Sequence, residues 1–175
     1  MNRPHNPKIE VAKELPPPSA RGVVALCVCA DGAAASNARG GVLGAVERAL
    51  AEGDFEGKEE TTLLVHAATE EGPRRLLLVG LGPSAEVRPD VLSRAAAAAA
   101  RRAREAAASH LTLVVPGHGD QSLAARAAAE GAVLGCYDNG FYQSEEEGRV
   151  ALERLTLVAE GTDLRAAVER GRVVA

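Results

Sequence analysis

The stretch Gly117-His118-Gly119-Asp120 carries the residue of this chain that is best suited to catalysis. His118 lies between two glycines, and Asp120 stands two positions further on. An imidazole beside a carboxylate can act as a general base near neutral pH. No serine or cysteine nucleophile motif accompanies the pair. We therefore favour another interpretation, in which His118 belongs to a loop and Asp120 caps the helix that follows.

A second candidate is the glycine-containing turn Gly80-Leu81-Gly82. It follows a predicted strand and precedes a predicted helix, where backbone N–H groups can hold a phosphate. The full Gly-x-Gly-x-x-Gly pattern is absent because residue 85 is alanine, and Pro83 has no N–H to donate. A tight turn at the end of a strand is therefore favoured over a nucleotide site.

Possible metal ligands are scattered along the chain. Cys27, Cys29 and Cys136 are odd in number and lack zinc-type spacing, which favours buried, inert thiols over a redox pair or a structural metal site. His66 lies within a predicted strand and has no second histidine or carboxylate at ligand spacing nearby. The run Glu145–Glu147 is typical of a solvated acidic turn. The sequence thus assigns no catalytic, cofactor-binding or metal residue.

Several arginines of a predicted helix could form a basic stripe for nucleic acid: Arg94, Arg101, Arg102 and Arg104. Glu105 interrupts this stripe, and no aromatic residue interleaves with it. The net charge of −4 also argues against a general polyanion binder. We therefore expect a solvated helix face and no nucleic-acid partner.

An alternation of strands and helices must position all of these residues. Strands are predicted at 9–11, 22–30, 61–67, 74–79, 111–115 and 152–158, and helices at 36–52, 89–109, 121–134 and 164–170. The turn at 71–73 predicts a hairpin, and residues 74–115 predict a β–α–β crossover. The pattern indicates an α/β protein, namely a three-layer α/β/α domain around a mixed, mostly parallel sheet.

Composition adds limits on size and location. A chain of 175 residues fits one domain. Hydrophobic residues make up 46% but aromatics only 2%, so the core must consist of Ala, Val and Leu. No apolar run approaches the ~20 residues needed to span a bilayer, and the N-terminus lacks the apolar segment of a secretory signal. We expect a cytoplasmic protein with no membrane partner.

Three segments, read in order, resemble the N-terminal domain of the leucine aminopeptidase (cytosol aminopeptidase) family. They are GGVLGAVERALAEGDFEGK at 40–58, RRLLLVGLGP at 74–83 with the Ala-rich helix after it, and the stretch from AAEGAVLGCY to FYQS at 128–144. One departure is Asn139, where the family usually has an aromatic residue. The resemblance implies a macro-domain-like fold for residues 1–175.

The family's chemistry belongs to a second, C-terminal domain. The resemblance implies that this domain holds two divalent metal ions, Zn or Mn, together with a catalytic Lys and Arg and an Asn-Thr-Asp-Ala-Glu-Gly-Arg motif. None of these motifs occurs in the 175 residues. The chain stops at 172–175, about where the family's linker begins. We therefore expect a separate, non-catalytic N-terminal domain of a two-metal leucyl aminopeptidase.

The resemblance also implies partners for this domain. They are its own catalytic domain, sister subunits in a homohexamer and the peptide substrates of the parent enzyme. Within the assembly the domain would contribute to subunit arrangement and to access to the active site.

An alternative is a binding module that uses the macro-like fold to hold ADP-ribose or a related nucleotide at 80–84 and 117–120. This hypothesis rests on fold analogy, which is weak evidence for function. DNA contact, a role that some bacterial members of the family combine with peptidase activity, is disfavoured by the acidic balance.

Three of the four aromatic residues follow the helix predicted at 121–134. They are Tyr137, Phe141 and Tyr142. We expect their rings to cover the C-terminal end of that helix, supplying bulk that alanine cannot. Tyr137 should then be buried, and its loss should destabilise the domain.

Overall fold

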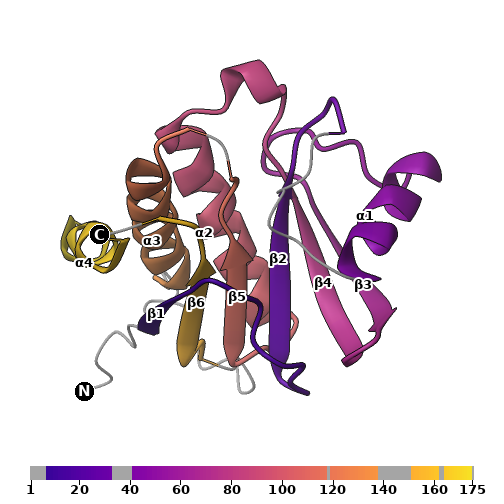
Figure 1. The fold of residues 1–175 in the computed structure, drawn as a ribbon, viewed down its shortest axis with the longest axis horizontal. Coiled ribbons are helices and arrows are strands. Elements are labelled where there is room, and N and C mark those ends of the chain that lie inside the picture. The colour runs from indigo at the N-terminus through magenta and orange to yellow at the C-terminus, as the bar shows by residue number, and fades with distance from the viewer. Residues whose placement is uncertain (1–6, 33–40, 118, 138–150, 162–163, 175) are drawn as a thin grey trace, which may run out of the picture.

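A computed structural model describes residues 7–32, 41–117, 119–137, 151–161 and 164–174 of this chain. Its centre is a six-stranded sheet with the order β1-β6-β5-β2-β4-β3 (Figure 1). The strands are β1 Lys8–Ala12, β2 Gly22–Val28, β3 Thr62–Thr69, β4 Gly72–Gly80, β5 His110–Val114 and β6 Arg154–Val158. All neighbours run parallel except β3, which pairs antiparallel with β4 as the predicted hairpin.

The strands form because short apolar runs can be covered on both faces of a sheet. In β2 every residue from 23 to 28 is buried. Ala25 and Cys27 point to one face, and Leu26 and Val28 point to the other, as the two-residue period of a strand requires. Such runs are typical of strands in the interior of a parallel sheet, and β2 lies between β5 and β4.

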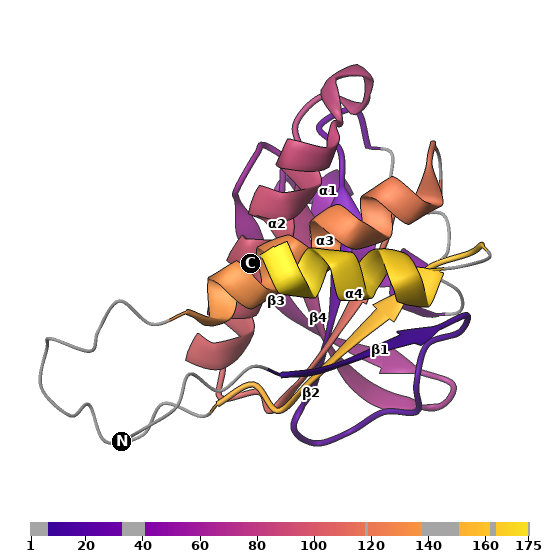
Figure 2. The same ribbon diagram turned by 90° about the vertical axis from the view of Figure 1, so that its left-hand side faces the viewer.

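Helices cover the two faces unequally. Helices α2 (Pro89–Glu105) and α3 (Gln121–Cys136) pack on one face, and α4 (Leu164–Val174) packs on α3 beside β1 (Figure 2). Helix α1 (Gly41–Ala51) packs on the other face, against β2, β4 and β3. A short 3₁₀ helix, η1 (Ser84–Glu86), precedes α2. The predicted three-layer α/β/α architecture is therefore confirmed.

The Ala-rich segment of α2 faces the interior of the domain. Ala96, Ala99, Ala100 and Ala103 of α2 are fully buried. Alanine has high helix propensity and a short side chain, so α2 can approach both the sheet and α3 closely. The core of this domain is therefore made mostly of Ala, Val and Leu side chains and contains almost no aromatic residues.

Two helix ends differ from the predictions. Helix α2 ends at Glu105 rather than near 109, because Ala107 adopts a positive φ of 53° that takes the chain out of the helix. Helix α4 was expected to end before Gly171, but it continues to Val174. Gly171 lies against α3, where a Cβ would come within 2.4 Å of the Arg126 carbonyl oxygen. It is therefore a packing glycine and not a stop signal.

The prediction for the aromatic residues was wrong where it can be compared with the structure. Tyr137 is 57% exposed at the C-cap of α3 and does not cover the helix end. Phe141 and Tyr142 lie outside the described residues. The buried aromatic among the described residues is Phe55, which is 5% exposed and packs beneath α1.

In the described part of the chain, no helix combines the length and apolar character needed to cross a bilayer.

Candidate functional site

The turn at the end of β4 is built for packing. The N–H of Gly80 donates to Thr61 O (2.9 Å), that of Leu81 to Val28 O (3.0 Å), and that of Gly82 to Gly57 O (2.9 Å). A phosphate-binding turn must keep such groups free for the ligand. Because all three donors are occupied, the structure supports the tight-turn interpretation over the nucleotide site.

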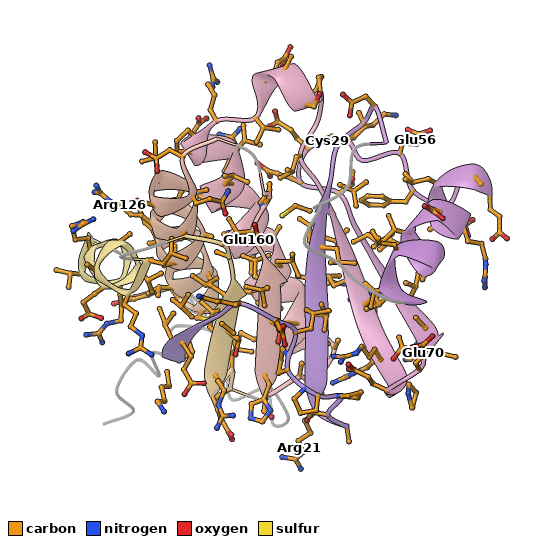
Figure 3. All side chains as sticks on the ribbon, viewed as in Figure 1. Arg21, Cys29, Glu56, Glu70, Arg126 and Glu160 are labelled. Carbon is orange, nitrogen blue, oxygen red and sulfur yellow. The ribbon has the colours of Figure 1, made fainter. Side chains whose placement is uncertain are left out.

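The glycines of this turn allow the loop after α1 to approach closely. A Cβ on Gly80 would come within 1.8 Å of Lys58 O, and a Cβ on Gly57 would come within 2.6 Å of Cys29 O. The backbone of residues 57–58 thus lies directly against the ends of β2 and β4. The Asp54–Lys58 turn, one of the segments that carry the family resemblance, therefore closes this edge of the sheet (Figure 3).

Of the two polar residues in the Gly117–Asp120 stretch, Asp120 lies in the described part of the chain, at the start of α3. His118 lies outside the described residues. Asp120 is the N-cap of α3, and its Oδ1 accepts hydrogen bonds from Ser122 N (2.9 Å) and Leu123 N (3.1 Å). This confirms the capping role predicted for Asp120, because its carboxylate satisfies two of the free N–H groups at the helix start.

The arginines of α2 are largely paired with acidic or carbonyl groups. Arg94 forms salt bridges with Glu59 (2.9 Å), Glu60 (3.2 Å) and Asp90 (3.1 Å), and its hydrogen bond with Glu59 is the main reason its pKa is raised. Arg102 forms a salt bridge with Glu105 (3.1 Å), and Arg104 donates a hydrogen bond to Cys136 O (3.2 Å). These pairs leave no continuous basic stripe, as the sequence indicated.

Cys27 and Cys29 are buried, Cys136 is partly buried, and all three thiols are protonated at neutral pH. Burial raises the pKa of Cys27 to about 12 and that of Cys136 to about 11. Burial also raises the pKa of Cys29, and the negative charge of Asp31 adds to this shift. Since the thiolate is the reactive form, these residues lack the activated state that redox or nucleophilic chemistry needs.

The remaining candidates do not form a metal site among the described residues. His66 is exposed on the edge strand β3. No group of three His, Cys, Asp or Glu side chains in the described ranges could hold a metal ion. Glu145–Glu147 lie outside those ranges. The described residues therefore do not fit the two ions of the family, and we derive no metal-dependent step from them.

A cavity that sequence reasoning missed lies at the opposite edge of the sheet. It has a volume of about 270 Å³ and lies beside the segment Pro16–Pro18, where β2, β5 and β6 begin. Figure 3 marks the two edges, with Arg21 just before the start of β2 and Cys29 just after its end. Arg74, His110 and Arg154, each at or near the start of a strand, contribute to its wall.

A signal for this cavity was present in the sequence. Arg74, His110 and Arg154 were each placed near the beginning of a strand. Since the starts of parallel strands meet at one edge of a sheet, these basic residues had to lie near one another. The sequence did not reveal that, among the described helices, none covers this face of β5 and β6.

Comparison with known proteins gives a consistent result. The family model described as "Cytosol aminopeptidase family, N-terminal domain" matches residues 29–146. A "Probable cytosol aminopeptidase" of Acidobacterium capsulatum is 40% identical over 126 residues, which is 70% of this chain and 25% of that protein. The protein of the same description from Thermosynechococcus vestitus is 34% identical over 122 residues, 67% of this chain and 24% of that one. The chain thus spans about a quarter of the length of these relatives.

Solved structures are similar in fold. A mutant of tomato leucine aminopeptidase matches with a TM-score of 0.70 and 22% identity, over 99% of this chain and 37% of that one. The bottromycin maturation enzyme BotP in complex with Mn matches with a TM-score of 0.58 and 26% identity, over 87% of this chain and 29% of that one. In both cases the similarity covers a minor part of a longer protein.

Proposed function

The chain belongs to the cytosol aminopeptidase family, and from this membership we propose that it is the non-catalytic N-terminal domain of a metal-dependent leucyl aminopeptidase. The observation that carries the proposal is the match of residues 29–146 to the family's N-terminal domain. The matched relatives extend to about four times the aligned length. The peptidase chemistry would then belong to a catalytic domain outside these 175 residues.

The chemistry of the described residues is consistent with this assignment. No three metal-ligating side chains gather anywhere in the described ranges, the three thiols are protonated at neutral pH, and the carboxylate of Asp120 caps a helix. A two-metal peptidase needs several carboxylate or imidazole ligands around a reacting water. Such a set would come from the catalytic domain, with Mn or Zn as the ions; the similar enzyme BotP was solved in complex with Mn.

We extend the proposal to the role of the domain in the assembly. It would contribute to subunit arrangement and active-site access in a homohexamer that removes N-terminal residues from peptides. The description of the family as cytosol aminopeptidases supports a cytoplasmic location.

The proposal is tested with two proteins that share this chain. The first is the 175-residue chain alone. The second is a fusion in which this chain replaces the N-terminal quarter of the Acidobacterium capsulatum relative, with the unaltered relative as the control. With Mn²⁺ or Zn²⁺ present, we expect the fusion to hydrolyse leucine p-nitroanilide and the chain alone to be inactive. Native mass spectrometry of the fusion should detect a hexamer. Hydrolysis by the pure chain, or tight Mn²⁺ binding by it in calorimetry, would contradict a non-catalytic role.

The nucleotide-binding alternative has less support. Its proposed contacts include the turn at 80–84, whose Gly80, Leu81 and Gly82 donors are already bonded within the protein. Calorimetric titration of the chain with ADP-ribose tests it directly, and we expect no heat of binding at millimolar ligand.

A further inference from the structure

The cavity beside Pro16–Pro18 has no role in the proposed function. We propose that it binds a small organic anion, a molecule with one carboxylate or phosphate group and a short apolar part. The inference does not depend on the aminopeptidase assignment, since it rests on the residues that line the cavity.

The register of the sheet places two kinds of side chain in adjacent rows. His110 pairs across the sheet with Arg154, and Thr112 pairs with Thr156. Residues two apart in a strand point to the same face, so the two basic side chains and the two hydroxyls share one face. That face is the one on which α1 packs, but α1 contacts β3 and the adjoining part of the sheet, and no helix of the described residues covers β5 and β6 on that face (Figure 1).

The two threonine hydroxyls lack partners. Thr112 is 6% exposed and Thr156 is 8% exposed, and both line the cavity. Neither hydroxyl makes a hydrogen bond to another residue in the described ranges. Both hydroxyls are therefore free to donate to a ligand in the cavity. Another lining residue adds to this, because Nη2 of Arg75 is buried and has no hydrogen-bond partner among the described residues. Burying such a polar atom without a hydrogen bond costs free energy, and an oxygen-rich ligand could accept from it.

The charge of the wall selects an anion. Three arginines and one histidine contribute to it, and none of the described lining residues is an Asp or a Glu, although the chain as a whole has a net charge of −4. A site lined by one sign of charge concentrates ligands of the opposite sign. The positive wall is therefore a local feature, which the composition of the chain does not explain.

The three arginines of the cavity wall differ in whether their guanidinium groups are already paired within the protein. Arg74 donates to Pro16 O (2.8 Å) and pairs with Glu71, and Arg75 donates to Ala106 O (2.9 Å). His110 lies 4.0 Å from Glu153. Arg154 is exposed and makes no hydrogen bond or salt bridge with a described residue.

One acidic side chain on the neighbouring strand interacts with Arg154 only through its charge. Glu10 of β1 forms its salt bridge with Lys8 at 2.7 Å, and the charge of Arg154 is a smaller cause of the lowered Glu10 pKa. Arg154 is therefore the side chain that we assign to the charged group of the ligand.

Size and polarity narrow the ligand class further. A volume of about 270 Å³ is at or below the small end of ligand pockets, which run from roughly 300 to 1,000 Å³. Pro16–Pro18 and Val24 supply an apolar wall. With no carboxylate in the described wall to pair with an ammonium group, a free amino acid or a peptide N-terminus fits poorly. A small anion with an apolar part fits the volume of the cavity, its apolar wall and the lack of a carboxylate among the described lining residues.

The test is an ¹⁵N–¹H NMR titration of the full 175-residue chain with three probes of similar size. Benzoate and phenyl phosphate distinguish the two anionic groups, and benzylamine is the cationic control. We expect saturable shifts of the Thr112, Thr156 and Arg154 amides with at least one anion and none with benzylamine. Arg154→Gln should weaken that binding about tenfold, since charge-assisted hydrogen bonds are the strong ones. Thr156→Val, which keeps the shape of the side chain, should also weaken it.

A matched variant controls for net charge. Arg101→Gln removes the same charge from an exposed site on α2, which does not line the cavity, and it should bind the anion as the unaltered chain does. The proposal is overturned if neither anion shifts these amides at millimolar concentrations. It is equally overturned if benzylamine shifts them as strongly, or if Arg154→Gln binds no more weakly than Arg101→Gln. The amide spectrum of each variant shows directly that it is folded.

Discussion

Gly131 of α3 lies so close to Ser93 of α2 that a Cβ on the glycine would come within 1.9 Å of the Ser93 carbonyl oxygen. One turn later, a Cβ on Gly135 would come within 2.4 Å of the Ala97 carbonyl oxygen. Residues four apart share one face of a helix, so the two glycines form a flat strip against which the backbone of α2 rests. This contact gives a physical reason for the glycine spacing in Glu-Gly-Ala-Val-Leu-Gly-Cys-Tyr, part of the segment that resembles the family.

Gly131→Ala should destabilise the domain. The added methyl group meets backbone, which cannot rotate away, so α2 and α3 must separate. Overpacking of this kind costs about 1–3 kcal/mol of unfolding free energy, which urea denaturation would measure. The control is Gly44→Ala in α1, where a Cβ meets nothing within 4 Å; there alanine should stabilise by about 0.5–1 kcal/mol through its higher helix propensity. Equal effects at the two sites would contradict the close helix approach.

Phe55→Ala should be among the most damaging substitutions in this chain. The ring is 5% exposed and belongs to the core beneath α1, so its removal should cost about 3–5 kcal/mol. Tyr137→Ala is the contrasting variant. Its ring is 57% exposed, and we expect a change within about 0.5 kcal/mol. Thermal unfolding of both proteins measures the difference, and a large effect at Tyr137 would restore the earlier interpretation that its ring is packed.

The order and type of the elements could be predicted because the evidence for them is local. The run Gly22–Ala30 is short and continuously apolar, which is typical of a strand covered on both faces. The turn at Gly72 lies between the apolar segments 61–67 and 74–79, which favours a hairpin. Gly171 shows where local evidence fails. A glycine near the end of a helical pattern normally marks its stop, yet here the helix continues because α4 must approach the Arg126 carbonyl of α3. That contact is tertiary and leaves no trace in the neighbouring sequence.

The site could be predicted only in part, for a similar reason. Asp120 was recognised as a cap because N-capping depends on a residue and the helix directly after it. A tight turn at Gly80 and Gly82 could be predicted, but no local pattern indicates that the loop at 57–58 packs against these glycines. The cavity near Arg154 depends on which strands α1 leaves uncovered, and that follows from packing across the whole sheet.

Asp120→Ala should weaken the domain through the start of α3. The variant loses the hydrogen bonds that Oδ1 accepts from Ser122 N and Leu123 N, and loss of an N-cap costs about 0.5–2 kcal/mol. Asp120→Asn keeps an acceptor oxygen at the same position and should recover most of the difference. Urea denaturation of the three proteins compares them. If Asn were as damaging as Ala, the role of Asp120 would lie in its charge and not in capping.

The buried thiol of Cys27 should make stability depend on pH in the alkaline range. Its pKa is raised by burial from an ordinary 9.0 to about 12. The folded state therefore retains a proton that the unfolded state releases. A raised folded-state pKa means that the stability is fully present below pH 9.0 and is lost as the pH rises toward about 12.

Urea denaturation between pH 9.0 and about 12 measures the unfolding free energies of the unaltered chain and of Cys27→Ala. Above pH 9.0 the unaltered chain should lose stability more steeply, by up to ~1.4 kcal/mol per pH unit for one group. The absolute stabilities will differ because Ala leaves a small void, so the slope is the informative quantity. Identical slopes would show that the thiol ionises as readily in the folded chain as in the unfolded one, contrary to its burial.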